Sequence, residues 1–190
     1  MKNKTILILL SFCFTVLSQN IKKPHPITAA ARTQLGTTVT YDPAYRKLNY
    51  PNGDVPVKTG VCTDVIIRAL RKAYKMDLQK LVHEDMKRNF NVYPKIWGLK
   101  STDKNIDHRR VPNLQTYFKR KGYSLKINDH DYEDGDIVTC LVGNRPHIMI
   151  VTNRKKADGV PLIIHNIGSG TKEEDFLTKH KITGHYRIKK

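Results

Sequence analysis

The hydrophobic pattern of this chain changes its period near Gly122, and this change constrains the fold more than any other feature. Before Gly122, apolar side chains recur every three or four residues, as on one face of an amphipathic helix. After it, short apolar runs alternate with turn residues, as in strands joined by hairpins. Helices followed by a run of strands predict an α+β domain, in which N-terminal helices pack on an antiparallel β-sheet.

The predicted elements follow from this periodicity and from the Gly and Pro positions. Four helices are predicted, at residues 27–35, 61–73, 77–90 and 113–121. Gly36 ends the first helix, and Pro112 stands where the fourth begins. Five strands are predicted, at residues 123–127, 136–142, 147–153, 161–167 and 182–188. The turn-rich passage 37–60 is predicted to be a loop that packing holds in place.

The N-terminus has the pattern of a secretory signal peptide. Lys2 and Lys4 precede an apolar stretch, 6–17, and Val16-Leu17-Ser18 forms the predicted cleavage site. The apolar stretch is short for a membrane span, and no later segment offers roughly 20 apolar residues. We therefore predict a signal peptide at 1–18, a linker at 19–26 and a single domain at 27–190. The mature protein is expected in the periplasm or outside the cell, with no transmembrane segment.

The chain is strongly basic. Its formal net charge is +17, and removal of the two leader lysines leaves +15. Nucleic-acid binding would explain this charge, but the basic residues are scattered and no recognisable nucleic-acid motif accompanies them. We predict no specific nucleic-acid partner. For an exported protein, contact with anionic envelope polymers or phospholipid is favoured, and a basic surface that contacts only water is the alternative.

Cys62 stands at the start of the predicted helix 61–73, where the helix dipole favours a thiolate. The dipole supplies roughly 0.3–1 kcal/mol, less than about one pKa unit, so a nucleophilic Cys62 also needs an imidazole to accept its proton. His147 and His165 lie in two predicted strands joined by a turn, and a hairpin would bring them close together. This arrangement predicts a Cys–His–His relay. An inert buried cysteine with two hydrogen-bonded sheet histidines is the alternative.

The order of motifs along the chain resembles the NlpC-type branch of the papain-like cysteine peptidases. These motifs are QLGTTVTY, GVCTD at a helix start, YEDGDIV, HIMIV and IIHN. More closely, residues 29–187 resemble a bacterial family known as domain of unknown function 1287. The stretches that carry this second resemblance are TYDPAY, YPNGDVP, GVCTDVIIRA, VHEDM, WGL, NIDHRRVPNL, DGDIVT, HNIG and ITGHYR.

The resemblance implies a papain-like, NlpC-type fold with a catalytic triad. In it, Cys62 is the nucleophile, His147 is the general base and then the acid, and His165 orients His147. Asn166 competes with His165 for the third position. Cys140 takes a strand position that is usually aromatic in the family, which implies a packing role. A Cys62–Cys140 disulfide stays open, although one pair of cysteines does not make a disulfide framework.

Further site residues are implied around the nucleophile. An upstream tyrosine often supplies an oxyanion donor beside the backbone N–H of the cysteine in NlpC-like enzymes, and Tyr41 aligns best. Tyr45 and Tyr50 are the alternatives. Asp64 departs from the family pattern, which places an aspartate immediately before the cysteine. Asp64 is therefore either a helix cap or a neighbour of the active site.

Before the fourth helix, the stretch NIDHRR gathers Asp107, His108, Arg109 and Arg110. One interpretation is a substrate-binding clamp in which an arginine fork holds a carboxylate. The other is a loop held together by Asp–Arg pairs. A metal site that combines this loop with residues 83–85 matches no zinc or calcium spacing. We predict no metal and no cofactor.

These features predict an exported cysteine amidase or peptidase that hydrolyses an amide bond in the peptides of cell-wall peptidoglycan. By analogy with NlpC-type enzymes, the bond would join D-γ-glutamyl and diamino acid residues, although a fold does not fix a substrate. A thiol acyltransferase on the same fold is one alternative. A non-catalytic envelope-binding module with a basic surface is the other.

Overall fold

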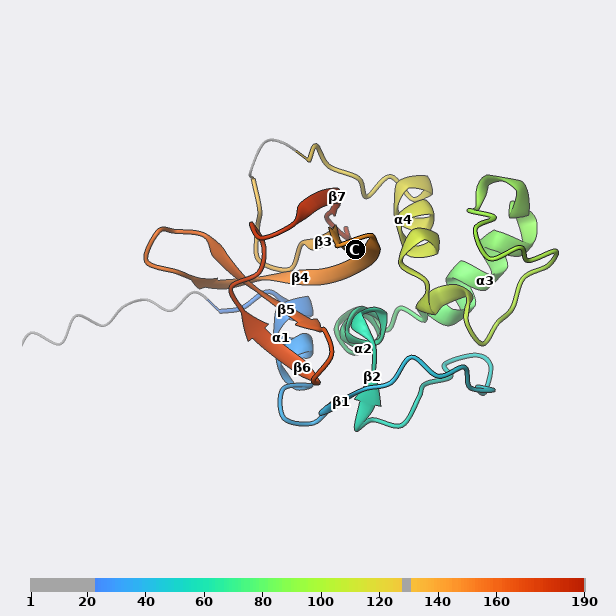
Figure 1. Cartoon of the computed structure of the whole chain (residues 1–190), viewed down its shortest axis with the longest axis horizontal. Coiled ribbons are helices and arrows are strands. Elements are labelled where there is room, and N and C mark those ends of the chain that lie inside the picture. Colours follow the sequence, from blue (N-terminus) through green and yellow to red (C-terminus); the bar gives the residue numbers. More distant parts are fainter. Residues whose placement is uncertain (1–22, 128–130, 190) are drawn as a thin grey trace, which may run out of the picture.

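A five-stranded antiparallel sheet organises the computed structural model, which describes residues 23–127 and 131–189 (Figure 1). The strand order is β6-β5-β4-β3-β7. The strands are β3 (Ile137–Val142), β4 (Arg145–Lys155), β5 (Pro161–Asn166), β6 (Thr171–Glu174) and β7 (Lys181–Tyr186). Consecutive strands from β3 to β6 pair as hairpins, and β7 returns to pair with β3. The prediction of an α+β architecture with an antiparallel sheet is confirmed.

The four predicted helices are present and precede the sheet. They are α1 (Pro26–Arg32), α2 (Cys62–Tyr74), α3 (Leu78–Arg88) and α4 (Val111–Arg120), with short 3-10 helices η1 (Phe90–Val92) and η2 (Asp107–Arg109). In Figure 1, α2 lies between the sheet on one side and α3 on the other. Lys75 ends α2 in the left-handed conformation, and the Asp77 side chain caps α3 by accepting hydrogen bonds from two backbone N–H groups.

Side chains alternate between the two faces of the sheet and form two apolar clusters. Ile148, Ile150 and Ile164 pack with α2 in the larger cluster, which also contains Cys62. The smaller cluster, on the opposite face, contains Cys140. The two cysteines are free thiols in this structure. The open alternative of a disulfide between them is therefore not realised, because the sheet separates the two side chains.

One predicted strand is absent from the structure, and three short strands were not predicted. Residues 123–127 do not form a strand: Ser124 makes an isolated bridge to Tyr186, and the neighbouring backbone bonds are too few for a ladder. β6 was not predicted, because its sequence TKEE lacks alternating apolar residues. Two further short strands, β1 (Thr40–Tyr41) and β2 (Thr59–Gly60), pair in parallel inside the passage predicted as a loop.

Arg68 on α2 holds the 37–60 passage against the helix that carries Cys62. Its guanidinium donates to the side chains of Asp54 and Thr38 and to the backbone oxygens of Val55 and Thr59. These hydrogen bonds satisfy backbone oxygens in a segment that has little regular secondary structure of its own. They also fix the backbone that leads into Cys62.

The predicted signal peptide, 1–18, and the linker up to residue 22 lie outside the described residues. Among the residues that the structure does describe, no helix is long and apolar enough to cross a membrane.

Candidate active site

Cys62 is the first residue of α2, and three contacts fix its position. The backbone N–H of Val61 donates to Asp64 Oδ2 over 2.7 Å, which caps the helix start. Asn166 Nδ2, from the end of β5, donates to the backbone oxygen of Gly60 over 2.9 Å. The backbone of Ile148 on β4 hydrogen-bonds the Cys62 sulfur. The thiol therefore lies against β4, at the backbone of the residue that follows His147.

Burial raises the pKa of the Cys62 thiol to about 12. The nearby Asp64 carboxylate acts in the same direction, while the backbone hydrogen bonds from Ile148 and Thr63 act against it. Desolvation thus outweighs the favourable effect of the helix start on the thiolate. Without a base, the Cys62 thiol keeps its proton at neutral pH.

Three side chains on adjacent strands form a continuous chain of hydrogen bonds, which we call the relay: His147 on β4, His165 on β5 and Glu174 on β6. His147 Nε2 lies 2.8 Å from His165 Nδ1, and His165 Nε2 lies 2.7 Å from Glu174 Oε1. The Phe176 ring packs on both imidazoles, with centroid separations of 5.7 Å and 4.5 Å. The Phe176 ring therefore restricts the movement of both imidazole rings.

The order of the relay fixes the protonation of each ring nitrogen. An ionised carboxylate only accepts hydrogen bonds, so His165 Nε2 must carry a proton and donate it to Glu174. In a neutral imidazole this leaves His165 Nδ1 as an acceptor, which receives the proton of His147 Nε2. His147 Nδ1 then holds a free lone pair. Glu174, two residues removed along the relay, thus makes His147 a base at its remaining nitrogen.

Burial lowers the pKa of His147 to about 3, and the neighbouring His165 and His180 add to this effect. Burial also lowers the pKa of His165, although its bond to Glu174 opposes the shift. Both imidazoles are therefore neutral at physiological pH, which is the state that the relay requires.

Two cavities meet at Cys62, and Tyr41 and Pro146 also line both. The His147-side cavity, of about 250 Å³, is lined in addition by His147, Arg145 and Gly168. His147 pairs with Cys140, so its side chain projects to the face of the sheet away from α2. It lies near the start of β4, and there it lines the same cavity as Cys62. The second cavity, of about 310 Å³, extends towards the start of α4, and we call it the α4-side cavity.

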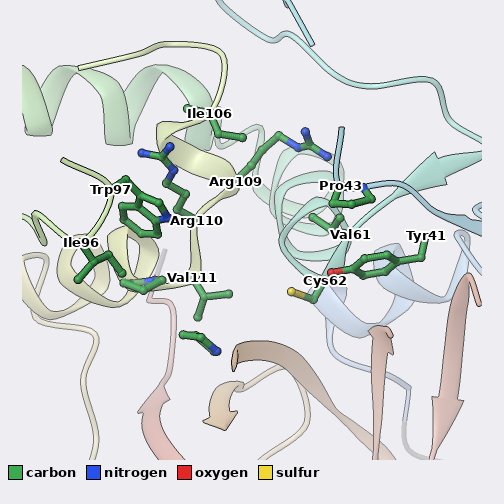
Figure 2. Close-up of a pocket in the computed structure, with 12 residues that line it drawn as sticks. Tyr41, Pro43, Val61, Cys62, Ile96, Trp97, Ile106, Arg109, Arg110 and Val111 are labelled. Carbon is green, nitrogen blue, oxygen red and sulfur yellow. The ribbon is translucent and has the colours of Figure 1, made fainter. Parts of the chain in front are cut away.

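Tyr41 lines both cavities together with Cys62. Figure 2 shows its hydroxyl directed towards Cys62. Burial raises the pKa of Tyr41, and the interaction with Cys62 acts in the same direction, so the phenol stays a hydrogen-bond donor. The alternatives lie elsewhere: the Tyr45 hydroxyl donates to Asp103, and the Tyr50 ring packs on His83.

The NIDHRR loop is largely occupied with internal contacts. Arg109 forms a two-pronged ion pair with Asp64, each prong 2.9 Å long, and both side chains are 3% exposed. Asp107 accepts hydrogen bonds from His83 Nδ1 and the backbone N–H of Asp103. The side chain of His108 is buried, and desolvation lowers its pKa to about 4. Of the four side chains named in this loop, Arg109 and Arg110 line the α4-side cavity, whereas Asp107 and His108 line neither cavity at Cys62.

Sequence reasoning missed Glu174 and undervalued Arg110. Glu174 lies in the unpredicted strand β6, and no motif marks it. Arg110 lines the α4-side cavity, and its guanidinium lies 4.2 Å from the Trp97 ring centroid. The two candidates for the third position have different contacts: His165 contacts His147, whereas Asn166 donates to the backbone before Cys62.

Comparison with known proteins shows that the chain belongs to the family described as domain of unknown function (DUF1287), whose model matches residues 28–188. The chain is 49% identical to the uncharacterized protein YijF of Escherichia coli strain K12 over 201 aligned residues. This alignment covers 97% of the present chain and 98% of YijF. No solved structure matches the present chain significantly.

Proposed function

We propose that this protein is an exported cysteine amidase or peptidase that cleaves amide bonds in peptidoglycan peptides through Cys62, His147 and His165. The observation that carries the proposal is the relay from Glu174 to His147, which ends in a cavity shared with a cysteine at a helix start. An inert cysteine needs no such neighbours. The resemblance to NlpC-type peptidases adds a papain-like fold and the substrate class to the proposal.

In the proposed reaction, His147 Nδ1 accepts the thiol proton as the Cys62 sulfur attacks the carbonyl carbon of the amide. The negative charge on the former carbonyl oxygen is stabilised by the backbone N–H of Cys62 and the hydroxyl of Tyr41. The C–N bond then breaks, and His147 returns the proton to the leaving amine. A water molecule, deprotonated by His147, attacks the thioester, releases the acid and regenerates the thiol.

The resting site is a neutral pair, and this gives a pH signature. The thiol pKa is raised to about 12 and the His147 pKa is lowered to about 3, so the proton moves during attack rather than before it. We expect kcat/KM to stay level across the neutral range and to fall only as the pH approaches about 3, where His147 becomes protonated. Circular dichroism at each pH separates this loss from acid unfolding.

A second measurement checks the same state directly. The ultraviolet absorbance of a thiolate should be absent at neutral pH, so wild type and Cys62→Ala should give the same thiolate signal. A thiolate signal at neutral pH, or an acid inflection of kcat/KM near neutrality, would instead indicate a preformed thiolate–imidazolium pair.

Glu174→Gln should lower kcat by about tenfold, part of the 10²–10⁴-fold that acid–base catalysis supplies, because an amide no longer dictates the protonation of His165. The matched control is Glu173→Gln on the same strand, since Glu173 pairs with Arg32 and Arg154 instead. That variant should lose stability and keep its kcat. Equal kcat values for the two variants would contradict a role for Glu174 in catalysis.

The function itself is tested by incubating the mature protein with purified peptidoglycan sacculi and analysing the soluble fragments by mass spectrometry. New amino and carboxyl ends in equal number are expected from hydrolysis. Added amine acceptors should not appear in the products; if they do, the reaction is acyl transfer. Sacculi that remain uncleaved, with basic-residue-dependent binding only, would favour an envelope-binding module.

A further inference from the structure

We propose that the α4-side cavity binds a carboxylate of the substrate through Arg110, whose guanidinium lies on the ring of Trp97. This inference rests on the proposed function for the identity of the substrate, but not for the existence of the anion site. Figure 2 shows the arrangement: Cys62 and Tyr41 lie on one side of the cavity, and Trp97, Ile96 and Arg110 lie on the other.

Arg110 is a cation without a matching anion. Among the described residues it forms no ion pair, and its buried Nη1 has no hydrogen-bond partner. Asp103 and Asp107 act on it through space, but neither forms an ion pair with it. The guanidinium of its neighbour Arg109 is occupied by Asp64 and by the backbone oxygens of residues 42 and 44. A buried donor that lacks a partner is costly, and no described residue uses the hydrogen-bonding capacity of this guanidinium.

The stacking on Trp97 leaves the hydrogen-bonding capacity of Arg110 intact. The guanidinium carbon lies over the indole, 4.2 Å from the ring centroid, and the ring takes up none of its N–H groups as a conventional acceptor. The N–H donors of a guanidinium point outward in its own plane, and this fork matches a carboxylate through two parallel hydrogen bonds. Trp97 therefore orients the fork without occupying it.

The first residues of two helices also border this cavity. Val61 and Cys62 at the start of α2, and Val111 and Pro112 at the start of α4, all line it. Neither helix has a side-chain cap from its N-cap residue, although Asp64 accepts from Val61 N–H. The N–H groups in the first turn of a helix carry partial positive charge, although Pro112 itself has no N–H. The starts of two helices and the Arg110 guanidinium therefore place positive charge around the same cavity.

The rest of the lining is apolar, which limits the class of ligand. Ile96, Ile106 and Pro43 complete the wall, and the cavity holds about 310 Å³. This space fits a short aliphatic segment that carries one carboxylate. Because Cys62 lines the same cavity, the carboxylate belongs to a residue that adjoins the scissile amide. A γ-linked glutamyl residue with a free α-carboxylate has this chemistry.

Trp97 is the only tryptophan in the chain, so its fluorescence reports on this cavity alone. The probes are N-acetyl-γ-glutamyl methylamide with a free α-carboxylate and the same compound with an α-carboxamide. Both are titrated into mature Cys62→Ala protein, which prevents turnover. We expect saturable binding of the carboxylate form, at least about tenfold tighter than that of the carboxamide, because a charge-assisted bond is replaced by a neutral one.

Arg110→Gln in the same background should abolish this preference. The control Lys119→Gln removes one positive charge from the exposed far end of α4 and should keep the preference, which excludes an effect of net charge. Equal affinity for both probes, or a preference that survives Arg110→Gln, would overturn the proposal. Should Arg110→Gln fail to fold, the comparison of the two probes on the parent protein decides.

The outcomes separate this inference from the proposed function. Carboxylate-selective binding without any cleavage of sacculi by the wild type would support the anion site and contradict the amidase. Cleavage with no loss on Arg110→Gln, and no preference between the probes, would support the amidase and overturn the anion site.

Discussion

Replacing Cys62 with alanine should reduce kcat on peptidoglycan fragments by at least about 10⁴-fold, because the nucleophile of a catalytic unit supplies most of its rate acceleration. The fold should persist, since the change removes one sulfur atom at the edge of the larger apolar cluster. Fragment release measured by mass spectrometry gives the rate, and thermal unfolding of the same preparation gives the stability.

Cys140→Ala is the matched control for this prediction. Cys140 is buried on the opposite face of the sheet and lines neither cavity at Cys62. Its removal should cost about 1 kcal/mol of unfolding free energy through lost packing and leave kcat unchanged. Turnover that survives Cys62→Ala, or that is lost to the same degree in Cys140→Ala, would contradict the assignment of the nucleophile.

Arg109→Leu should lower the free energy of unfolding by about 3–5 kcal/mol, because it leaves the Asp64 carboxylate buried without a counter-charge. Both side chains of this ion pair are 3% exposed, so water does not replace the lost guanidinium. The fall in melting temperature should be roughly 6–20 °C for a domain of this size. Chemical denaturation at neutral pH measures the free energy directly.

A surface pair provides the control. Arg154 contacts Glu173 but is 64% exposed, so Arg154→Leu should cost no more than about 1 kcal/mol. The double variant Asp64→Leu/Arg109→Leu should lose less than the sum of the two single variants, because it leaves no unpaired charge. If Arg109→Leu and Arg154→Leu had the same free energy of unfolding, the buried Arg109–Asp64 pair would not be a major source of stability at the start of α2.

The sequence predicted all four helices and most of the sheet, because these depend on contacts between near neighbours in the chain. The spacing of apolar residues after Val61 places α2, and with it Cys62 at a helix start. The turn between two apolar runs predicted that His147 and His165 would lie on adjacent strands, and the structure brings them to 2.8 Å. Residues 123–127 had a strand pattern but found too few backbone partners along β7.

The chemistry of the site depended on contacts that no local pattern determines. Strand register decides which side of β5 faces His147, and a slip of one residue would have exchanged His165 for Asn166. Register also brings Glu174 to His165. Packing between α2 and the loop before α4 brings Arg109 into an ion pair with Asp64. The same packing places Arg110 at the wall of the α4-side cavity. Periodicity determines which elements form, but only the three-dimensional packing of distant segments determines which side chains meet.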